Sequence, residues 1–272
     1  MGVSKWLSAL RRPGNVSIAL LPAYNEAKSI ASVLDRVAPH VDAILVVDDC
    51  STDETVNVVR QWGQQHEGAY LVALPHNVGA SGALRAGYVL VSYLLRIGVL
   101  APDDVIVELD SDGQHDPIYI PQLLQFFREA KPFDVVLTRR DFSVYPAYKR
   151  IGNCGLSLIA SIFSDYWYRD VESNFRASRV RVFPELLKYF SGYRYSGAFE
   201  VGIIHALCKQ RIHNEMSVNV PFYRPGASAI DGLHVLMFGL IAMLRVRLGI
   251  GRADFQSEEE LVLKYSESIG PG

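Results

Sequence analysis

Short apolar runs alternate with longer amphipathic stretches over the first half of the chain. Five runs rich in β-branched residues predict strands at 16–21, 43–48, 69–74, 104–109 and 134–138. Between them, apolar residues at helical spacing predict helices within 27–37, 52–62, 81–95 and 118–129. Strands that are apolar throughout and separated by helices are typical of a mostly parallel sheet covered on both faces. The pattern therefore predicts an α/β doubly wound core over about residues 14–140.

Each of the first four predicted strands is followed by a cluster of polar residues. The clusters are PAYNE after the first strand, DDCSTD after the second, HNVGASG after the third and DSDGQHD after the fourth. Ligands of such sheets bind at the carboxyl ends of the strands. We therefore expect the binding site at this edge of the sheet.

After residue 140 the pattern is less regular. Apolar segments predict helices at 155–168 and 198–210, and a strand within 211–223. The segment from Leu233 to Ile250, the most apolar of the later chain, has only about a dozen residues before Arg245, fewer than the roughly 20 that span a bilayer. The acidic C-terminus predicts a surface helix with a frayed tail. The expected organisation is an N-terminal extension, one α/β domain, and an amphipathic helix with a polar tail, at 1–14, 15–230 and 231–272.

The composition is that of a globular protein. Of its 272 residues, 49% are hydrophobic and 21% are charged, which allows a sizeable core. The formal net charge is -2, so no overall positive field would attract nucleic acid, and we expect no such partner. Three widely spaced cysteines without a CxxC pair favour a reducing, cytosolic setting over a disulfide framework. The N-terminus, interrupted by Pro13, does not resemble a secretory signal.

One part of the chain is strongly basic. Residues 139–194 contain ten basic residues against five acidic ones, a local excess of +5. The basic residues are Arg139, Arg140, Lys149, Arg150, Arg169, Arg176, Arg179, Arg181, Lys188 and Arg194. Arginine binds phosphate through a planar fork of N–H groups, so this excess suits a phosphate ligand. A solvated basic face is the alternative, and composition alone does not separate the two.

The fourth polar cluster places two carboxylates one residue apart, directly after a buried strand. Asp110 and Asp112 would repel each other unless a divalent cation lies between them and a polyanionic ligand. Mg²⁺ and Mn²⁺ prefer a few carboxylates together with phosphate and water oxygens, so the pair suggests a nucleoside diphosphate site. The alternative is a loop whose aspartates cap the helix that begins near Pro117. His115 is either a further ligand or a loop histidine.

Four segments, in this order and spacing, resemble the nucleotide-binding half of inverting family 2 glycosyltransferases with the GT-A fold. They are LLPAYNEAKSI, ILVVDDCSTDET, HNVGASGALRAGY and VELDSDGQHDP. Two later segments, SNFRASR and VPFYRPGAS, resemble the branch of dolichyl-phosphate mannose synthase and polyprenyl-phosphate glucosyltransferases. The likeness covers about residues 15–230. It implies a Rossmann-like GT-A fold and metal-dependent transfer of a hexose from UDP or GDP to a dolichyl- or undecaprenyl-type phosphate.

The resemblance also implies roles for individual residues. The nucleotide would contact Pro22, Tyr24, Glu26, Asp48, Asp49, Gly79 and Asp110. The cofactor, Mg²⁺ or Mn²⁺, would be bound by Asp110, Asp112 and Gln114. The acceptor phosphate would be held by Arg140, Arg150 and Arg224. The catalytic set would be Asp112, Arg140, Arg150 and Asp170. Asn174 stands where the family commonly has glycine, in the acceptor region.

The chemistry of the acceptor leaves alternatives. A phosphomonoester, with a second pKa near ~6, is already ionised at neutral pH and needs cations rather than a general base. Asp170 and Glu172 would then orient the arginines and the sugar, which is the role we expect. With a saccharide or other hydroxyl acceptor, one of the two would be an essential base. A second alternative is a non-catalytic subunit that binds sugar nucleotides and recruits partners.

Two apolar segments are candidates for contact with a membrane surface. Residues 155–168 end in Tyr166, Trp167 and Tyr168, and residues 233–250 include Arg245 and Arg247. Aromatic side chains and terminal arginines beside an apolar face are typical of an interfacial helix. We expect peripheral binding at the cytosolic face of a membrane. A core helix, a homo-oligomer contact and a membrane-protein partner are the alternatives.

Overall fold

The structure, a computed structural model, describes residues 15–128, 133–221, 229–252 and 254–269 of the chain. Its strands are β1 (Ser17–Ala23), β2 (Ala43–Asp48), β3 (Ala69–Ala73), β4 (Val105–Glu108), β5 (Val135–Arg140), β6 (Arg176–Arg179), β7 (Ile212–Val218) and β8 (Ser266–Ser268). Its α-helices are α2 (Ile30–Val37), α3 (Thr55–Gly63), α4 (Ala80–Arg96), α5 (Ile120–Gln125), α6 (Ala147–Ser164), α7 (Phe183–Tyr189), α8 (Gly197–Leu207), α9 (Ala229–Leu248) and α10 (Gln256–Lys264). Short 3-10 helices are η1 (Ala38–His40), η2 (Pro117–Tyr119), η3 (Phe142–Val144) and η4 (Val180–Val182).

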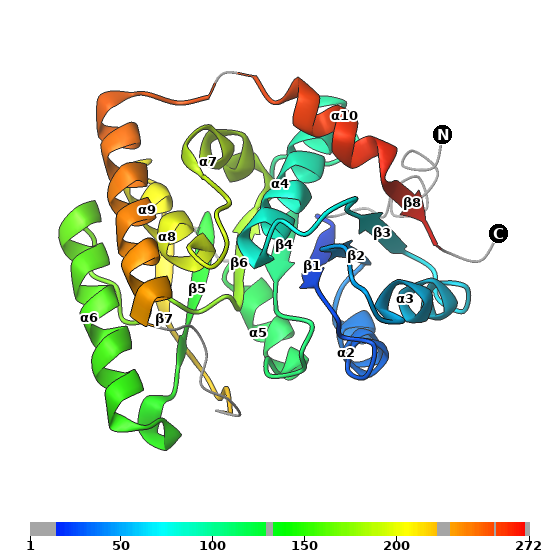
Figure 1. The fold of residues 1–272 in the computed structure, drawn as a ribbon, viewed down its shortest axis with the longest axis horizontal. Helices are drawn as coiled ribbons and strands as arrows, with labels where there is room; N and C mark the ends of the chain where they lie inside the picture. The colour runs from blue at the N-terminus through cyan, green and yellow to red at the C-terminus, as the bar shows by residue number, and fades with distance from the viewer. Residues whose placement is uncertain (1–14, 129–132, 222–228, 253, 270–272) are drawn as a thin grey trace.

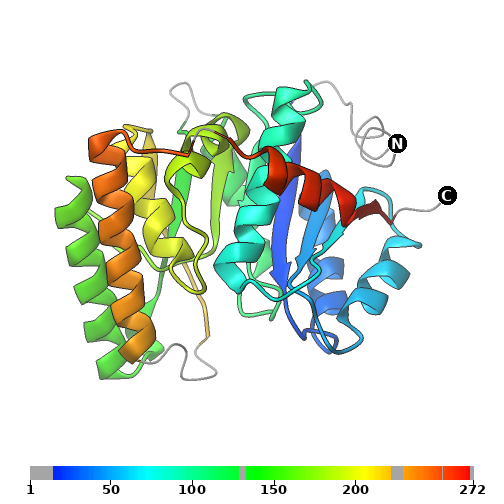
Figure 2. The same ribbon diagram turned by 45° about the horizontal axis from the view of Figure 1, so that its top comes forward.

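All eight strands form one sheet, in the order β7-β5-β6-β4-β1-β2-β3-β8. The five strands predicted in the first half are present, and β1, β2, β3 and β4 pair in parallel. Helices cover both faces of this sheet, with α4 on one side and α2 and α3 on the other (Figures 1 and 2). The mostly parallel α/β sheet expected from the sequence is therefore confirmed.

The strand β6 lies between β4 and β5 and was not predicted. It runs antiparallel to both neighbours, so β4 and β5 run in the same direction. β7 is parallel to β5 and shares that direction. The carboxyl ends of β1, β2, β4 and β5 consequently lie at one edge of the sheet, and the loops that follow them meet there.

The C-terminal tail differs from the frayed end that its polar sequence predicts. The predicted surface helix is present as α10, but residues Ser266–Ser268 form β8, which pairs antiparallel with β3. β8 is the outermost strand on that side of the sheet. An edge strand can be polar because only one of its sides is paired and little of its surface is buried. The prediction of a frayed tail was therefore wrong for these three residues.

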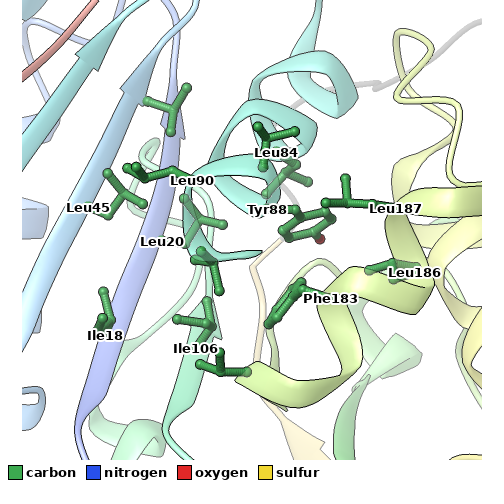
Figure 3. Packing of buried hydrophobic residues seen from close by; sticks show 14 of the residues in the cluster. Ile18, Leu20, Leu45, Leu84, Tyr88, Leu90, Ile106, Phe183, Leu186 and Leu187 are labelled. Carbon is green, nitrogen blue, oxygen red and sulfur yellow. The ribbon is translucent and has the colours of Figure 1, made fainter. Parts of the chain in front are cut away.

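Alternation along the buried strands divides the core into layers. In β1, Ile18 and Leu20 contact the layer that includes α4, while Ala19 and Leu21 contact the layer that includes α2. Figure 3 shows the first layer, in which Tyr88 of α4 packs against Phe183 of α7, with ring centroids 4.8 Å apart. Residues on both faces of β1, β2 and β4 are buried, as is usual for parallel sheets.

A buried polar cluster joins β4 to β6 under this layer. Glu108 of β4 lies opposite Arg176 of β6 in the strand register, and Arg176 Nε donates to Glu108 Oε2 at 2.8 Å. The hydroxyl of Tyr88 donates to the same carboxylate and accepts from Arg176 Nη2 at 3.0 Å. All three side chains are buried. We call this cluster the seam. It lies where β6 joins two parts of the sheet, one formed by β1, β2, β3 and β4 and the other by β5 and β7.

Candidate active site

A cavity of about 420 Å³ opens at the carboxyl ends of β1, β2 and β4. We call it the donor cavity. It brings together seven residues predicted from the sequence, namely Pro22, Tyr24, Glu26, Asp49, Gly79, Asp110 and Asp112. Tyr24 is 47% exposed, so its ring is available to a ligand in the cavity. The four polar clusters therefore meet in space as their places after the strands predict.

The segment Asp110–Ser111–Asp112, which follows the buried strand β4, places its two carboxylates at the cavity. Ser111 turns inward, where it is buried and its hydroxyl donates to Pro22 O at 2.8 Å. That bond ties the end of β4 to the end of β1, and both neighbouring aspartates line the cavity. His115 is buried and its Nδ1 accepts from Asp110 N at 3.0 Å. His115 thus holds the loop in place, as the plainer of its two interpretations predicts.

The aspartate that caps the following helix is Asp116. Its Oδ1 accepts from Ile118 N at 3.1 Å at the start of η2. Asp112 instead accepts from Gln114 N at 2.9 Å and from Gln114 Nε2 at 2.7 Å. Gln114 lies beside the predicted metal ligands but does not line the donor cavity. Because capping falls to Asp116, the capping alternative does not explain Asp110 and Asp112.

The acidic residues of the donor cavity raise one another's pKa. Burial raises the pKa of Glu26, and the charges of Asp112 and Asp110 raise it further. Burial also raises the pKa of Asp112, and the charge of Asp110 adds to the effect. A bound cation would relieve this repulsion.

The carboxylate oxygens of the donor cavity fit a divalent cation that is also bound by oxygens of a substrate. In the described part of the chain, no three His, Cys, Asp or Glu side chains are grouped so as to hold a metal ion. Mg²⁺ and Mn²⁺ do not require such a cage, because they commonly bind one or two carboxylates, water and substrate phosphates. Asp110 and Asp112 supply carboxylates of this kind at the wall of an open cavity.

The two aspartates at the end of β2 differ in position. Asp49 lines the donor cavity, and its carboxylate accepts from Val78 N at 2.7 Å and Gly79 N at 2.8 Å. Asp48 is buried and does not line the cavity; one of its oxygens accepts from Ser51 N at 3.0 Å. Its other oxygen has no partner among the described residues. The structure thus brings Asp49, but not Asp48, to the predicted nucleotide site.

Several residues that line the donor cavity were not predicted from the sequence. Asn77, Ser111 and Tyr195 line it, together with Asn174, which was noted only as a departure from the family pattern. Tyr195 belongs to the loop 191–196, far from the other lining residues in the sequence. The turn-rich aromatic stretch SGYRYSG was the available signal for this loop.

A second cavity, of about 840 Å³, lies around the carboxyl end of β5 and the start of α6. We call it the basic cavity. Four arginines line it, which are Arg139, Arg140, Arg150 and Arg169. Apolar and aromatic walls come from Phe142, Leu158, Trp167 and Tyr168. Arg224, the third predicted phosphate ligand, lies outside the described residues.

Arg140 is held by Asp170 in a two-point ion pair. Nε and Nη2 of Arg140 each donate to a different Asp170 oxygen at 2.8 Å, and the Arg140 N–H donates at 3.1 Å. Burial opposes the charge of Arg140, but Asp170 and Glu172 raise its pKa above the ordinary value. Nη1 of Arg140 has no hydrogen-bond partner among the described residues. The geometry therefore leaves part of the guanidinium available to a ligand in the basic cavity.

Glu172 lies close to this pair but plays a different part. Burial raises its pKa to about 7, although the charge of Arg140 lowers it. One of its oxygens is buried and has no partner among the described residues. Glu172 lines neither the donor cavity nor the basic cavity.

The remaining basic residues of 139–194 have mixed roles. Arg176 belongs to the seam, while Arg179 and Arg181 both pair with Asp103. Lys188 pairs with Glu185 within α7. Four of the ten therefore line the basic cavity, and the local excess of charge is only partly explained by it.

An apolar stripe extends along α6 from the mouth of the basic cavity. Tyr148, Ile151, Leu158 and Ile162 are exposed and recur at helical spacing, so they share one face. α9 lies beside α6 in both ribbon views, and it also exposes apolar residues (Figures 1 and 2). These are Leu233, Met237, Leu240, Ile241, Leu244 and Leu248. Within the described ranges, no helix is long and apolar enough to cross a membrane.

Comparison with known proteins identifies relatives of this chain. A family model described as "Glycosyl transferase family 2" matches residues 18–198. A UDP-N-acetylglucosamine–dolichyl-phosphate N-acetylglucosaminyltransferase of Methanococcus voltae is 28% identical over 202 residues, which are 68% of this chain and 78% of that protein. An undecaprenyl-phosphate mannosyltransferase of Micrococcus luteus is 29% identical over 171 residues, 60% and 66% of the two chains.

A solved structure shares the fold. The glucosyl-3-phosphoglycerate synthase of Mycobacterium tuberculosis superposes with a TM-score of 0.59 at 21% identity, covering 92% of this chain and 86% of that one. A crystal structure of the same synthase with Mn²⁺ and UDP-glucose gives a TM-score of 0.58 at 20% identity, over 92% and 85% of the two chains. The likeness confirms the predicted α/β fold.

Proposed function

Since the chain belongs to glycosyl transferase family 2 and has its GT-A fold, we propose that it transfers a hexose from a nucleoside diphosphate to a polyprenyl phosphate. The donor is a UDP- or GDP-hexose, and the transfer is metal-dependent and inverts the anomeric centre. The relatives from M. voltae and M. luteus, named for dolichyl and undecaprenyl phosphates, support this acceptor class.

The observation that carries the proposal is the basic cavity and its apolar surroundings. Four arginines line a space that also has apolar and aromatic walls from Phe142, Leu158, Trp167 and Tyr168, with Asp141 and several serines between them. The exposed stripe of α6 begins beside it. A phosphate head group on a long hydrocarbon chain has the matching two-part chemistry. The donor cavity lies at the same edge of the sheet, because β4 and β5 run in the same direction.

Each part of the proposed reaction has residues suited to it. A divalent ion on Asp110 and Asp112, with Gln114 beside them, would neutralise charge on the diphosphate leaving group. Arg150 and the free Nη1 of Arg140 hold the acceptor phosphate so that its oxygen is directed at the anomeric carbon. Asp170 fixes the orientation of Arg140 and does not act as a base, since both its oxygens already accept from that guanidinium.

The exposed apolar residues of α6 and its surroundings would give the site access to a lipid substrate. Side chains such as Ile151 and Trp167, which are 73% and 68% exposed, would enter the boundary between lipid head groups and chains. Arg150 and Arg169 lie next to them and would meet anionic head groups. We propose peripheral binding at the cytosolic face, with α6 and α9 against the membrane.

One observation favours a second candidate, a transferase of the same fold with a hydroxyl acceptor. Such a reaction needs a general base, and a pKa of about 7 suits Glu172 to that role. Glu172, however, lines neither cavity. If Glu172→Gln retains full turnover with a polyprenyl phosphate, the base is unnecessary and the phosphate acceptor is favoured.

Release of nucleoside diphosphate tests the proposal directly. The purified protein is incubated with Mn²⁺ and a panel of UDP- and GDP-hexoses, with and without a polyprenyl phosphate. Strong dependence of release on the lipid phosphate is the expected result. Equal release with the matching polyprenol, which lacks the phosphate, would contradict a phosphate acceptor. Binding of sugar nucleotides without any release would instead indicate a non-catalytic subunit.

A further inference from the structure

A third cavity, of about 630 Å³, shares part of its wall with the donor cavity. The shared residues are Asn77, Gly79 and Tyr195. Its remaining walls include the loop 191–196 and two residues further along the chain, Phe238 and Arg252. The described residues that line it include two arginines, Arg194 and Arg252, and no acidic residue. We call it the Arg194 groove.

The loop 191–196 is fixed against the start of α4. Arg194 O accepts from Ser81 N at 2.8 Å, and Ser81 Oγ accepts from Gly197 N at 2.8 Å. On its other side, Ser191 N and Oγ donate to the buried carboxylate of Glu200 at 2.8 and 2.6 Å. The position of Arg194 relative to Gly79 is therefore set by the fold.

Arg194 has a backbone conformation that is unusual for its type. Its φ is 40°, in the left-handed region that costs a non-glycine residue free energy. A Cβ built on Gly79 would lie 3.0 Å from Arg194 Cα, and Gly79 itself has a φ of 82°, so a side chain at this position would be crowded and strained. Strained residues of this kind occur often at ligand sites.

The side chain of Arg194 is free to bind a ligand. It is exposed, and its guanidinium lies 5.9 Å from the centre of the Tyr193 ring. No carboxylate pairs with it in the described ranges. Arg252, in contrast, already donates to Glu258 Oε1 at 3.3 Å.

The described residues that line the donor cavity include no basic side chain to bind a diphosphate. Four carboxylates line it, from Glu26, Asp49, Asp110 and Asp112, and none of its described lining residues is a lysine or arginine. A single divalent ion cannot balance these charges together with those of a diphosphate. We propose that Arg194 binds the diphosphate of the donor across the wall that the Arg194 groove and the donor cavity share. This inference rests on the proposed function, because it assumes a nucleoside diphosphate donor.

Nucleotide binding tests the inference without turnover. Affinities of UDP and GDP are measured by calorimetry with Mn²⁺ present, and the nucleosides uridine and guanosine serve as ligands without a diphosphate. Arg194→Asn removes the charge but keeps a residue that tolerates the left-handed region, so the variant is expected to fold at least as stably. Lys209→Asn is the matched control, because Lys209 is also an exposed cation with positive φ, 60°, and it does not line the groove.

The expected result is a loss of about tenfold in affinity for the nucleotide in Arg194→Asn, from removal of a charged hydrogen bond. Nucleoside affinity and the affinities of Lys209→Asn stay at wild-type values, and Arg194→Lys shows a smaller loss. Unchanged affinity in a folded Arg194→Asn, with wild-type protein binding a nucleotide, overturns the inference alone. Wild-type protein that binds neither UDP nor GDP overturns the proposed donor chemistry and this inference together.

Discussion

The donor cavity and the basic cavity lie at the same edge of one sheet but are built in different ways. The donor cavity is formed mainly by residues that directly follow β1, β2 and β4, so their places are fixed by the parallel strands. The basic cavity is formed by the end of β5, the helix α6 and residues 167–169. The first gathers carboxylates and the second gathers arginines. Two cavities of opposite charge therefore lie at one edge of the sheet without sharing a lining residue.

The two cavities also differ in how their charges are compensated. In the donor cavity, like charges crowd together, and the pKa of Asp112 and of Glu26 is raised by burial and by neighbouring acids. In the basic cavity, Arg140 is stabilised by the buried Asp170, and Arg169 pairs with Glu215 on the surface. The donor cavity thus holds its carboxylates close together with no lysine or arginine among its described lining residues, whereas the basic cavity pairs some of its charges.

Removing a carboxylate from the donor cavity is expected to have the largest effect. Asp112→Asn should lower turnover by about a thousandfold, because charge on the leaving group would lose its stabilisation. Turnover is measured as nucleoside diphosphate release at saturating Mn²⁺. Asp116→Asn is the control, since Asp116 is acidic and belongs to the same loop but caps η2. Substantial activity in Asp112→Asn, or wild-type activity in excess chelator, would contradict the metal-dependent mechanism.

Breaking the seam should destabilise the fold that holds the two cavities together. Arg176→Met leaves Glu108 buried without its ion-pair partner, which costs about 3–5 kcal/mol. The free energy of unfolding is measured with urea. The double variant Glu108→Met/Arg176→Met leaves neither charge unpaired and should be more stable than the single variant. If Arg176→Met is as stable as wild type, the seam does not couple the two parts of the sheet.

The sequence indicated that most residues that line the donor cavity would meet at one edge of the sheet, because they directly follow apolar strands. PAYNE, DDCSTD and DSDGQHD each follow a recognisable strand, so parallel pairing alone brings them together. Tyr195 could not be found in this way. Its place depends on the packing of the loop 191–196 against Gly79, a contact between distant parts of the chain.

The unpredicted strands have polar sequences whose partners come from elsewhere. β6 reads RASR, and both of its arginines are buried. Arg176 pairs with Glu108, while Arg179 pairs with Asp103 and also donates to backbone carbonyl oxygens. β8 reads SES and forms by pairing with the edge of β3. Hydrophobic periodicity does not predict such contacts. For the same reason, the count of basic residues left a phosphate site and a solvated basic face open, and it did not indicate which four arginines would line the basic cavity.

The pH dependence of stability tests the surroundings of the basic cavity. The pKa of Glu172 is about 7 in the folded protein, above its ordinary value of 4.5. The unfolded chain therefore releases this proton first, and the native state loses stability as pH rises from 4.5 to 7. Glu172→Gln should remove this loss, so its stability relative to wild type should rise through that window, by at most about 3 kcal/mol.

The measurement is the free energy of unfolding in urea at pH 4.5, 6 and 8. Glu54→Gln, a change at an exposed glutamate, is the matched control. A constant difference between Glu172→Gln and wild type across these pH values would show that folding does not raise the pKa of Glu172.

Within the basic cavity, unpaired and paired arginines should differ. Arg150 has no carboxylate partner among the described residues, while Arg169 donates to Glu215 at 3.0 Å. Arg150→Gln should raise the KM for polyprenyl phosphate about tenfold, because a charged hydrogen bond to the phosphate is lost. Arg169→Gln should have a smaller effect, and neither change should alter nucleotide affinity. Equal effects of the two, or a loss of UDP and GDP binding in Arg150→Gln, would contradict the separation of the two cavities.

The smallest expected effect concerns the apolar stripe of α6. The double variant Ile151→Ser/Ile162→Ser should lower binding to vesicles about fivefold, since two exposed apolar side chains would no longer enter the lipid. Binding is measured by co-sedimentation with vesicles that contain anionic lipid.

Ile118→Ser is the matched control, because Ile118 is 67% exposed but lies in η2, away from α6. A change in oligomeric state with unaltered vesicle binding would instead assign the stripe to a contact between copies of the chain. Because the substitutions leave the arginines in place, turnover with a short, water-soluble polyprenyl phosphate should be retained. That result would separate reaching the membrane from binding the phosphate.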